Sequence, residues 1–327
     1  MVFRVALIGL GMAVAPHAKS LADLRERVEV AYAYSPSAER RAKFAAQFPF
    51  PLCDRLETIL EDRSIGAVLI LTPPNTHLEL VQRCAAAGKH ILLEKPLEIS
   101  TARAEQLVQS AAKVKLGIVL QHRFRPAAEK LGELLKAGRL GELVSASAMV
   151  PNWRPQSYYD LPGRGTRARD GGGVLVTQGI HTLDLFLSLT GKVSEVKSFT
   201  TTTRVHKMET EDLAVAAVRF ESGALGVIHA TTTAYPGYPE RIELIGTKGT
   251  ALLEGTSLKA QFIGGDSVEM KTESGAGGTG ADPMAFPHDW HRSLLADFLN
   301  AVEHDREPRV SGNEALKVHR FIDALLA

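Results

Sequence analysis

The first 120 residues alternate between short apolar stretches and longer segments with helical spacing. The apolar stretches are strand-like and rich in β-branched residues, and they cover residues 3–8, 28–34, 67–72, 90–93 and 117–120. Between two of them, segment 100–114 begins with Ser100, a typical capping residue, and repeats small and apolar residues on one face. Strands joined by helices need crossover connections, which give a parallel sheet covered on both faces. The sequence therefore predicts an α/β, doubly wound dinucleotide-binding (Rossmann) domain over residues 1–121.

The pattern changes after residue 121. Longer strand-like stretches follow, joined by short turns, at residues 143–150, 213–220, 224–232, 241–245 and 250–253. This spacing is typical of an antiparallel or mixed sheet. Two helix-like segments, 291–303 and 313–326, close the sequence. We therefore expect an α+β domain on an open mixed or antiparallel sheet over residues 122–327, and the last helix is a candidate for packing back on the first domain.

Composition excludes several classes of function. Thirty-eight Lys and Arg face 37 Asp and Glu in 327 residues, for a net charge of +1, which argues against a chain-wide basic surface for nucleic acid or anionic lipid. No apolar run approaches the roughly 20 residues of a membrane span, and the N-terminus has no signal-peptide pattern. Cys53 and Cys84 are too few for a disulfide framework or a cysteine metal cage. We expect a cytoplasmic protein without a metal.

A glycine pair follows the first strand-like stretch. Gly9 is placed to permit the tight turn of a Rossmann motif, and Gly11 to let the backbone approach a pyrophosphate at a helix N-terminus. Met12 and Ala13 complete this turn, and Val14 stands where the full fingerprint has Gly or Ala. The alternative is a plain turn between a strand and a helix.

The end of the second strand bears on the choice between NAD and NADP. NAD enzymes usually carry Asp or Glu there for the ribose hydroxyls, whereas this chain has Ser35 and Ser37 followed by Arg40 and Arg41. Hydroxyl and guanidinium groups suit a 2′-phosphate, so the sequence favours NADP. The alternative is that both arginines lie on a solvated helix face.

Further motifs then occur in a characteristic order. Together they resemble the glucose–fructose oxidoreductase, inositol dehydrogenase and MocA (Gfo/Idh/MocA) family, and the resemblance covers essentially the whole chain. The motifs are Thr72-Pro73-Pro74-Asn75-Thr76-His77, Glu94-Lys95-Pro96, Asp170-Gly171-Gly172-Gly173, Gln178-Gly179-Ile180-His181-Thr182-Leu183-Asp184 and Gly312-Asn313-Glu314-Ala315-Leu316.

The resemblance implies an NAD(P)-dependent dehydrogenase or reductase of a sugar, polyol or related compound. It also implies a homodimer or homotetramer formed through the C-terminal sheet. By this resemblance Lys95 lies beside the nicotinamide and contacts the reacting hydroxyl, and His181 moves the proton. The expected cofactor-binding residues are Gly9, Gly11, Met12, Ala13, Ser35, Ser37, Arg40, Thr72, Pro73, Asn75, His77, Glu94, Lys95 and Gln121. The expected substrate-binding residues are Arg123, Trp153, Tyr159, Gln178 and Asp184.

Residue chemistry is consistent with these roles. Burial near a cationic nicotinamide lowers the pKa expected for Lys95, and an imidazole such as His181 titrates near neutrality. Alternatives remain for each residue taken alone: Lys95 as a surface lysine, His181 as a packing residue, Asp184 as a helix-positioning residue. His77 is expected to support the cofactor-side loop, Trp153 and Tyr159 could belong to the core, and Arg123 could tie the domains together.

The chain departs from the family pattern at two positions. Thr177 stands where many inositol dehydrogenase-like members have an Asp, and Val14 crowds the glycine fingerprint. These departures motivate a second hypothesis, a dinucleotide-binding sensor or assembly subunit without catalysis. The segment 153–166 partly resembles a subgroup that oxidises nucleotide-linked sugars, so a nucleotide sugar and an unlinked sugar both stay open. The sequence has no cluster of zinc-ligand residues and no Gly-x-Ser-x-Gly motif, so neither zinc catalysis nor a serine nucleophile is supported.

Overall fold

The computed structural model describes residues 2–271 and 287–327, which divide into two compact units. Unit 1 comprises Met1–Val119 and Pro287–Leu316, and unit 2 comprises Leu120–Phe286 and Lys317–Ala327. The first division falls close to the expected boundary after residue 121. However, Pro287–Leu316 groups with the first unit, so the second unit is not one continuous stretch of chain.

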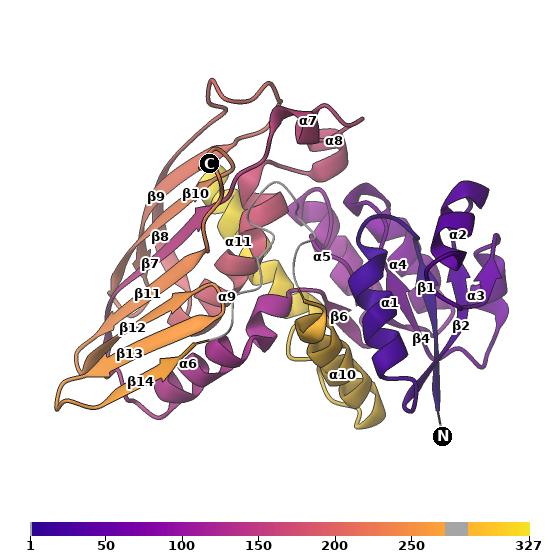
Figure 1. Cartoon of the computed structure of the whole chain (residues 1–327), viewed down its shortest axis with the longest axis horizontal. Coiled ribbons are helices and arrows are strands. Elements are labelled where there is room, and N and C mark those ends of the chain that lie inside the picture. The colour runs from indigo at the N-terminus through magenta and orange to yellow at the C-terminus, as the bar shows by residue number, and fades with distance from the viewer. Residues whose placement is uncertain (1, 272–286) are drawn as a thin grey trace. The chain divides into compact units, whose positions relative to one another are not determined.

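Unit 1 is built on a six-stranded sheet with the order β3-β2-β1-β4-β5-β6 (Figure 1). All neighbouring strands are parallel, which is the order and direction of a doubly wound dinucleotide-binding fold. The predicted fold class of the first domain is confirmed. The strands are β1 Phe3–Ile8, β2 Val28–Tyr34, β3 Leu52–Cys53, β4 Ala67–Ile70, β5 His90–Leu93 and β6 Leu116–Ile118.

Helices connect these strands and bury the sheet. Every residue of β4 is buried, as expected for a central parallel strand covered on both faces. The helix α1 packs against α10, and α4 packs against α5. The helices of unit 1 are α1 Val14–Asp23, α2 Ala38–Ala45, α3 Glu57–Glu61, the 3₁₀ turn η1 Pro74–Thr76, α4 His77–Ala86, α5 Thr101–Ser110 and α10 Asp289–Glu303.

Two helix starts follow directly from the sequence. The Ser100 hydroxyl accepts a hydrogen bond from the Arg103 N–H and caps α5, as predicted. The Ser37 hydroxyl caps α2 in the same way, accepting from the Arg40 N–H. A serine that begins α2 thus lies directly after the strand whose end was expected to bind the ribose.

Unit 2 is built on an eight-stranded sheet with the order β14-β13-β12-β11-β7-β10-β9-β8. The sheet is mixed, because β7 and β10 pair in parallel whereas the other neighbours are antiparallel. The open mixed sheet is confirmed. Its strands are β7 Leu143–Pro151, β8 Val193–Thr201, β9 Leu213–Phe220, β10 Leu225–Thr231, β11 Arg241–Gly246, β12 Gly249–Glu254, β13 Ser257–Phe262 and β14 Ser267–Met270.

Helices cover one face of this sheet. Figure 1 shows α6 and α9 on that face, and no described helix lies on the opposite face. The other short segments of unit 2 lead into and out of the strands. The helical segments are η2 Gln121–Phe124, α6 Pro126–Lys136, α7 Gln156–Tyr159, α8 Arg167–Asp170, the π-helical turn η3 Leu175–Gly179 and α9 Ile180–Thr190, and α11 Gly312–Leu326 spans the second division between the units.

Within residues 2–271 and 287–327, no helix combines the length and the apolar character that crossing a membrane requires.

Candidate active site

The glycine turn after β1 has the geometry that a dinucleotide requires. Gly9 has φ +103°, and a Cβ there would lie 3.0 Å from the Leu71 carbonyl carbon and oxygen, so only glycine fits. A Cβ on Gly11 would meet no atom within 4 Å, which leaves open space beside that backbone. No side chain caps the N-terminus of α1, although Val14 itself is buried. The turn therefore suits a pyrophosphate at the start of α1.

The end of β2 is followed by two serines and two arginines, and both serine hydroxyls accept backbone N–H groups there. Ser35 is buried, and the Arg41 guanidinium donates to its carbonyl at 2.6 Å. Arg40 is exposed in the first turn of α2, and Glu39 beside it forms an ion pair with Lys43. Of the two arginines, Arg41 thus holds the end of β2 and Arg40 is exposed.

The turn after β4 carries Thr72, Pro73 and Asn75, followed by His77 at the start of α4. The Thr76 hydroxyl donates to the Thr72 hydroxyl at 2.8 Å and to the Pro73 carbonyl at 2.8 Å. The His77 ring is fully buried, and its Nε2 lies 2.9 Å from the Thr72 carbonyl oxygen. Backbone contacts of this kind fix the shape of the turn at the carboxyl end of the sheet, where ligands of such folds bind.

Lys95 lies in the neighbouring turn, directly after β5, and is half-buried. The carboxylate of Glu94 accepts a hydrogen bond from the Lys95 N–H at 3.1 Å and contacts His17 Nε2 at 2.8 Å. Burial raises the pKa of Glu94, but the His17 hydrogen bond and the neighbouring positive charges outweigh it, so the net pKa lies below the usual range. Unit 1 therefore brings the glycine turn, Thr72 and Lys95 to the carboxyl ends of adjacent parallel strands.

His181 lies in the first turn of α9, immediately after the π-helical turn η3. Its ring stacks on the ring of His122, with centroids 4.9 Å apart. The Arg125 guanidinium lies 2.6 Å from His122 Nε2 and pairs with the buried Glu240. A π-helical turn inside a helix is uncommon and frequently marks a functional position.

The glycines before η3 are required by packing. A Cβ on Gly173 would lie 1.8 Å from the Glu211 carbonyl oxygen. The Glu211 carboxylate in turn accepts from the N–H groups of Gly173 and Leu175 at 3.0 and 3.1 Å. Burial raises the pKa of Glu211 despite these hydrogen bonds. Glu211, which lies just before β9, thus holds the glycine-rich segment that leads to His181.

Thr177 lies in η3, at the position where the family pattern has an Asp. Its hydroxyl donates to the Gly173 carbonyl at 2.7 Å and also contacts the side-chain oxygen of Gln178. The threonine therefore serves the internal bonding of η3 and contributes no charge there.

The expected substrate-binding residues of unit 2 are largely bound to other side chains. Arg123 donates to both carboxylate oxygens of Asp184, at 2.7 and 2.6 Å, and the Asp184 side chain is 1% exposed. Gln121, which was expected to bind the cofactor, is buried, and its Oε1 has no hydrogen-bond partner among the described residues. Such an orphaned buried acceptor is consistent with a polar ligand that the structure does not contain.

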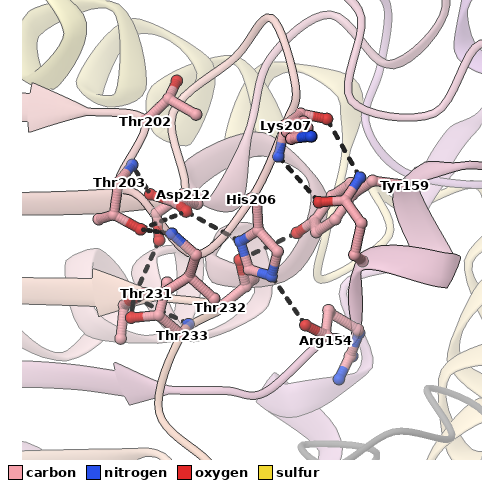
Figure 2. Close-up of polar contacts among 12 residues, drawn as sticks. Arg154, Tyr159, Thr202, Thr203, His206, Lys207, Asp212, Thr231, Thr232 and Thr233 are labelled. Atoms are coloured by element: carbon pink, nitrogen blue, oxygen red, sulfur yellow. Dashed lines mark hydrogen bonds and ion pairs between the residues drawn. The ribbon is translucent and has the colours of Figure 1, made fainter.

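The rings of Tyr159 and Trp153 lie beside the ring of His206, with centroids 4.8 and 6.2 Å from it, and His206 belongs to a buried polar network (Figure 2). The Tyr159 hydroxyl donates to Thr232 at 2.9 Å, and burial raises the pKa of Tyr159 to about 12. At the centre, His206 contacts the Asp212 carboxylate at 2.8 Å and the Arg154 carbonyl at 2.8 Å, as Figure 2 shows. Tyr159 thus belongs to the packed interior of unit 2, which is the core alternative raised from the sequence.

Sequence reasoning did not identify a buried group in unit 1 formed by His17, Glu94 and His291. One ligand atom from each lies within 4.8 Å of the others. Burial lowers the pKa of His291 to about 3, so its ring is neutral at physiological pH. No local pattern announces this group, because its members lie on α1, after β5 and on α10 and meet only through the fold.

The comparisons with known proteins agree with this geometry. Residues 3–122 match the model of an oxidoreductase family with an NAD-binding Rossmann fold, and residues 128–252 match the GFO/IDH/MocA C-terminal domain. A myo-inositol 2-dehydrogenase from Thermotoga maritima is 30% identical over 95% of this chain and 91% of its own length. The chain belongs to the GFO/IDH/MocA family. The expectation of an NAD-binding oxidoreductase is therefore confirmed.

Two further relatives of this GFO/IDH/MocA protein cover nearly the whole chain. An inositol 2-dehydrogenase from Rhizobium meliloti is 28% identical over 99% of this chain and 96% of its own length. The crystal structure of the WlbA dehydrogenase from Bordetella pertussis, in complex with NADH and UDP-GlcNAcA, has a TM-score of 0.84 and 26% identity. It covers 100% of this chain and 96% of that chain.

Proposed function

We propose that this GFO/IDH/MocA protein transfers a hydride between a nicotinamide cofactor and a secondary alcohol of a sugar, polyol or nucleotide sugar. The observation that supports this most is the arrangement in unit 1, where Lys95 follows β5 beside the strand ends that carry the Gly9 turn and Thr72. Relatives named as inositol dehydrogenases support the same reaction class. A bound nicotinamide would supply the hydride acceptor or donor.

The chain's own residues would handle the proton and the oxygen. Lys95 contacts the reacting oxygen and stabilises the charge that develops there. His181 moves the hydroxyl proton, because imidazole is the side chain best suited to both accepting and donating a proton at neutral pH. The stacked ring of His122 and the π-helical turn fix the orientation of the His181 ring within unit 2.

The test uses Lys95→Ala, with Lys113→Ala, an exposed lysine of unit 1, as the matched control. A panel of inositols, free sugars and UDP-linked sugar acids is assayed by nicotinamide absorbance. We expect Lys95→Ala to lower kcat by about 10²–10⁴-fold, the usual size of acid–base effects, with the cofactor Kd nearly unchanged. Wild-type turnover in Lys95→Ala would refute this role. A chain that binds the dinucleotide but turns over nothing would instead support the sensor hypothesis.

For the cofactor we propose a preference for NADP. The exposed Arg40 and the half-buried Ser37 follow β2, and residues 35–38 contain no carboxylate that would repel a 2′-phosphate; the first one, Glu39, pairs with Lys43. The WlbA structure contains NADH, so the opposite preference is a real outcome. Arg40→Ala should weaken NADPH binding by roughly tenfold, as expected for loss of a charge-assisted hydrogen bond, and leave NADH binding unchanged. Equal effects on both cofactors would contradict the assignment.

We also propose that the uncovered face of the unit 2 sheet binds a second copy of this chain. Apolar side chains lie on that face in three neighbouring strands. Phe199 of β8 (82% exposed) pairs with Val215 of β9, and Val227 of β10 (55% exposed) pairs with Ala217, two residues further along β9. Exposed apolar patches usually mark interfaces. Val227→Lys should lower the assembled mass in light scattering and leave thermal unfolding of the separated chain nearly unchanged. An unchanged mass would refute this interface.

A further inference from the structure

The turn that carries Lys95 is held on both sides by buried histidines from other elements. Before it, His17 of α1 contacts Glu94. After it, His77 of α4 contacts the carbonyl groups of Pro96 and Leu97. Their exposed fractions are 1% for His17 and 0% for His77, so neither ring can meet substrate from solvent.

The His77 ring joins two turns at the carboxyl edge of the sheet. Its Nδ1 lies 3.1 Å from the carbonyl oxygens of both Pro96 and Leu97, and its Nε2 lies 2.9 Å from the Thr72 carbonyl oxygen. One nitrogen therefore faces the Lys95 turn and the other faces the expected cofactor turn. A neutral imidazole has one N–H and an imidazolium has two. The contact of His77 with the Lys95 turn and its contact with Thr72 therefore need not hold the two turns equally strongly.

The His17 ring acts on the same turn through a carboxylate. Its Nε2 lies 2.8 Å from one oxygen of Glu94, and the other oxygen of Glu94 accepts from the Lys95 N–H at 3.1 Å. Glu94 is itself 9% exposed. Rotation of this carboxylate would release the backbone at Lys95, and His17 opposes that rotation.

We propose that His77 and His17 are positioning residues, which hold the Lys95 turn so that the lysine amine meets the reacting oxygen. This inference rests on the proposed function of Lys95. It assigns a purpose to two buried histidines that no contact with substrate explains. An error of about 1 Å in the placement of a reacting group can lower a rate by about 10²-fold, so buried hydrogen bonds at such a turn affect turnover directly.

A metal ion is a poorer occupant of the His17, Glu94 and His291 group. Ligand atoms about 2.0–2.1 Å from a tetrahedral zinc lie roughly 3.3 Å apart. The 2.8 Å separation between His17 Nε2 and the Glu94 oxygen is instead a hydrogen-bond distance. The group is therefore a hydrogen-bonded pair of His17 and Glu94 beside the neutral ring of His291.

Asn and Gln variants separate the two ring nitrogens. The amide nitrogen of Asn can replace a ring Nδ1, and that of Gln can replace a ring Nε2. At position 77 the Lys95 turn contacts Nδ1, so His77→Asn should keep kcat within about fivefold and His77→Gln should lower it by about 10²-fold. At position 17 the contact uses Nε2, so the order reverses: His17→Gln should keep kcat and His17→Asn should lower it.

The cofactor Kd, measured by fluorescence titration with NADPH and NADH, gives a second readout. His77→Asn loses the link to Thr72 and should weaken cofactor binding several-fold, whereas His77→Gln should not. Positioning is supported if Asn preserves kcat at position 77 and Gln preserves it at position 17. At position 77, Asn should weaken cofactor binding and Gln should lower kcat. The same order at both positions, or losses that simply follow thermal stability, would refute it.

Hydrogen exchange of the peptide covering residues 94–99 keeps the test independent of turnover. His77→Gln and His17→Asn should speed exchange there, and the other two variants should not. Lys95→Ala separates the two proposals: if it retains turnover the proposed function fails, and if it is inactive while all four histidine variants remain at wild-type kcat and exchange, the positioning role fails. One equivalent of zinc in the purified protein that is lost in His17→Asn would also overturn the hydrogen-bonded interpretation.

Discussion

The polar groups of the two units differ in what they contact. In unit 1, the groups around the candidate cofactor site chiefly contact backbone: His77 contacts three carbonyls, Arg41 contacts one, and Glu94 accepts a backbone N–H besides its contact with His17. In unit 2, the residues expected to bind substrate contact other side chains, as in Arg123 with Asp184. The first arrangement shapes turns for a ligand, and the second fixes helices and strands of the unit itself.

This difference predicts that substitutions in unit 2 affect stability more than recognition. Asp184→Asn is expected to have the largest effect, because it leaves the Arg123 guanidinium, whose side chain is only 12% exposed, opposite a neutral buried amide. Removing one partner of a buried ion pair typically costs about 3–5 kcal/mol. Urea unfolding should show that loss. The exposed pair of Glu39 and Lys43 supplies the control, and Glu39→Gln should leave unfolding unchanged.

A stable Asp184→Asn variant with a raised substrate KM would contradict the prediction that Asp184 affects stability more than substrate recognition. It would show that the carboxylate of Asp184 serves substrate, as the sequence first suggested, and that its pairing with Arg123 is secondary.

Gly173, which lies before η3, gives a second test of whether residues of unit 2 serve stability. Gly173→Ala places a Cβ against the Glu211 carbonyl oxygen, 1.8 Å away before any relaxation, so the backbone of η3 must move. We expect a loss of roughly 3 kcal/mol, in the range of overpacking. Gly132→Ala in α6 is the matched control, because its Cβ meets nothing within 4 Å. There, alanine should stabilise the helix by about 0.5–1 kcal/mol.

Activity separates local strain from general loss of stability. Gly173→Ala should lower kcat even at temperatures where the chain is folded, because His181 follows η3 directly. An unchanged kcat in folded Gly173→Ala would show that η3 does not orient His181.

Much of unit 1 could be predicted from sequence, because periodic apolar stretches and glycine turns are local signals. Residues 28–34 and 90–93 were predicted as strands and form β2 and β5. The predicted strand 67–72 is shorter, since β4 ends at Ile70 and Thr72 lies in the turn. In unit 2, β8 gave no clear signal, because most of its residues are exposed and polar or charged.

The candidate site divides in the same way. Gly9 and Lys95 stand in recognisable motifs, so their positions at the strand ends could be anticipated. The partners of Lys95's turn could not, because His17 lies 77 residues from Glu94 and the contact depends on how α1 packs. Likewise, the buried contact of His206 with Asp212 has no signature in an otherwise threonine-rich loop. Pairings of this kind are decided by tertiary packing, which local patterns do not encode.

The smallest predicted effect concerns His291 and the pH dependence of unit 1. Burial lowers the pKa of His291 from 6.5 to about 3, so the unfolded chain binds a proton at this residue in a range where the folded chain does not. Stability from this group is therefore complete above pH 6.5 and falls as the pH decreases towards about 3. Between pH 6.5 and pH 5 the loss should be about 2 kcal/mol.

Urea unfolding of the wild type and of His291→Gln at pH 7 and pH 5 measures this loss directly. The variant cannot take up the proton, so its stability should change less with pH by about 2 kcal/mol. Glu94 does not confuse the result, because a lowered carboxyl pKa gives stability that is lost only as pH falls below the ordinary value of 4.5. Equal pH dependence in both proteins would mean that the His291 ring can be protonated in the folded state, and that α10 leaves it accessible to water.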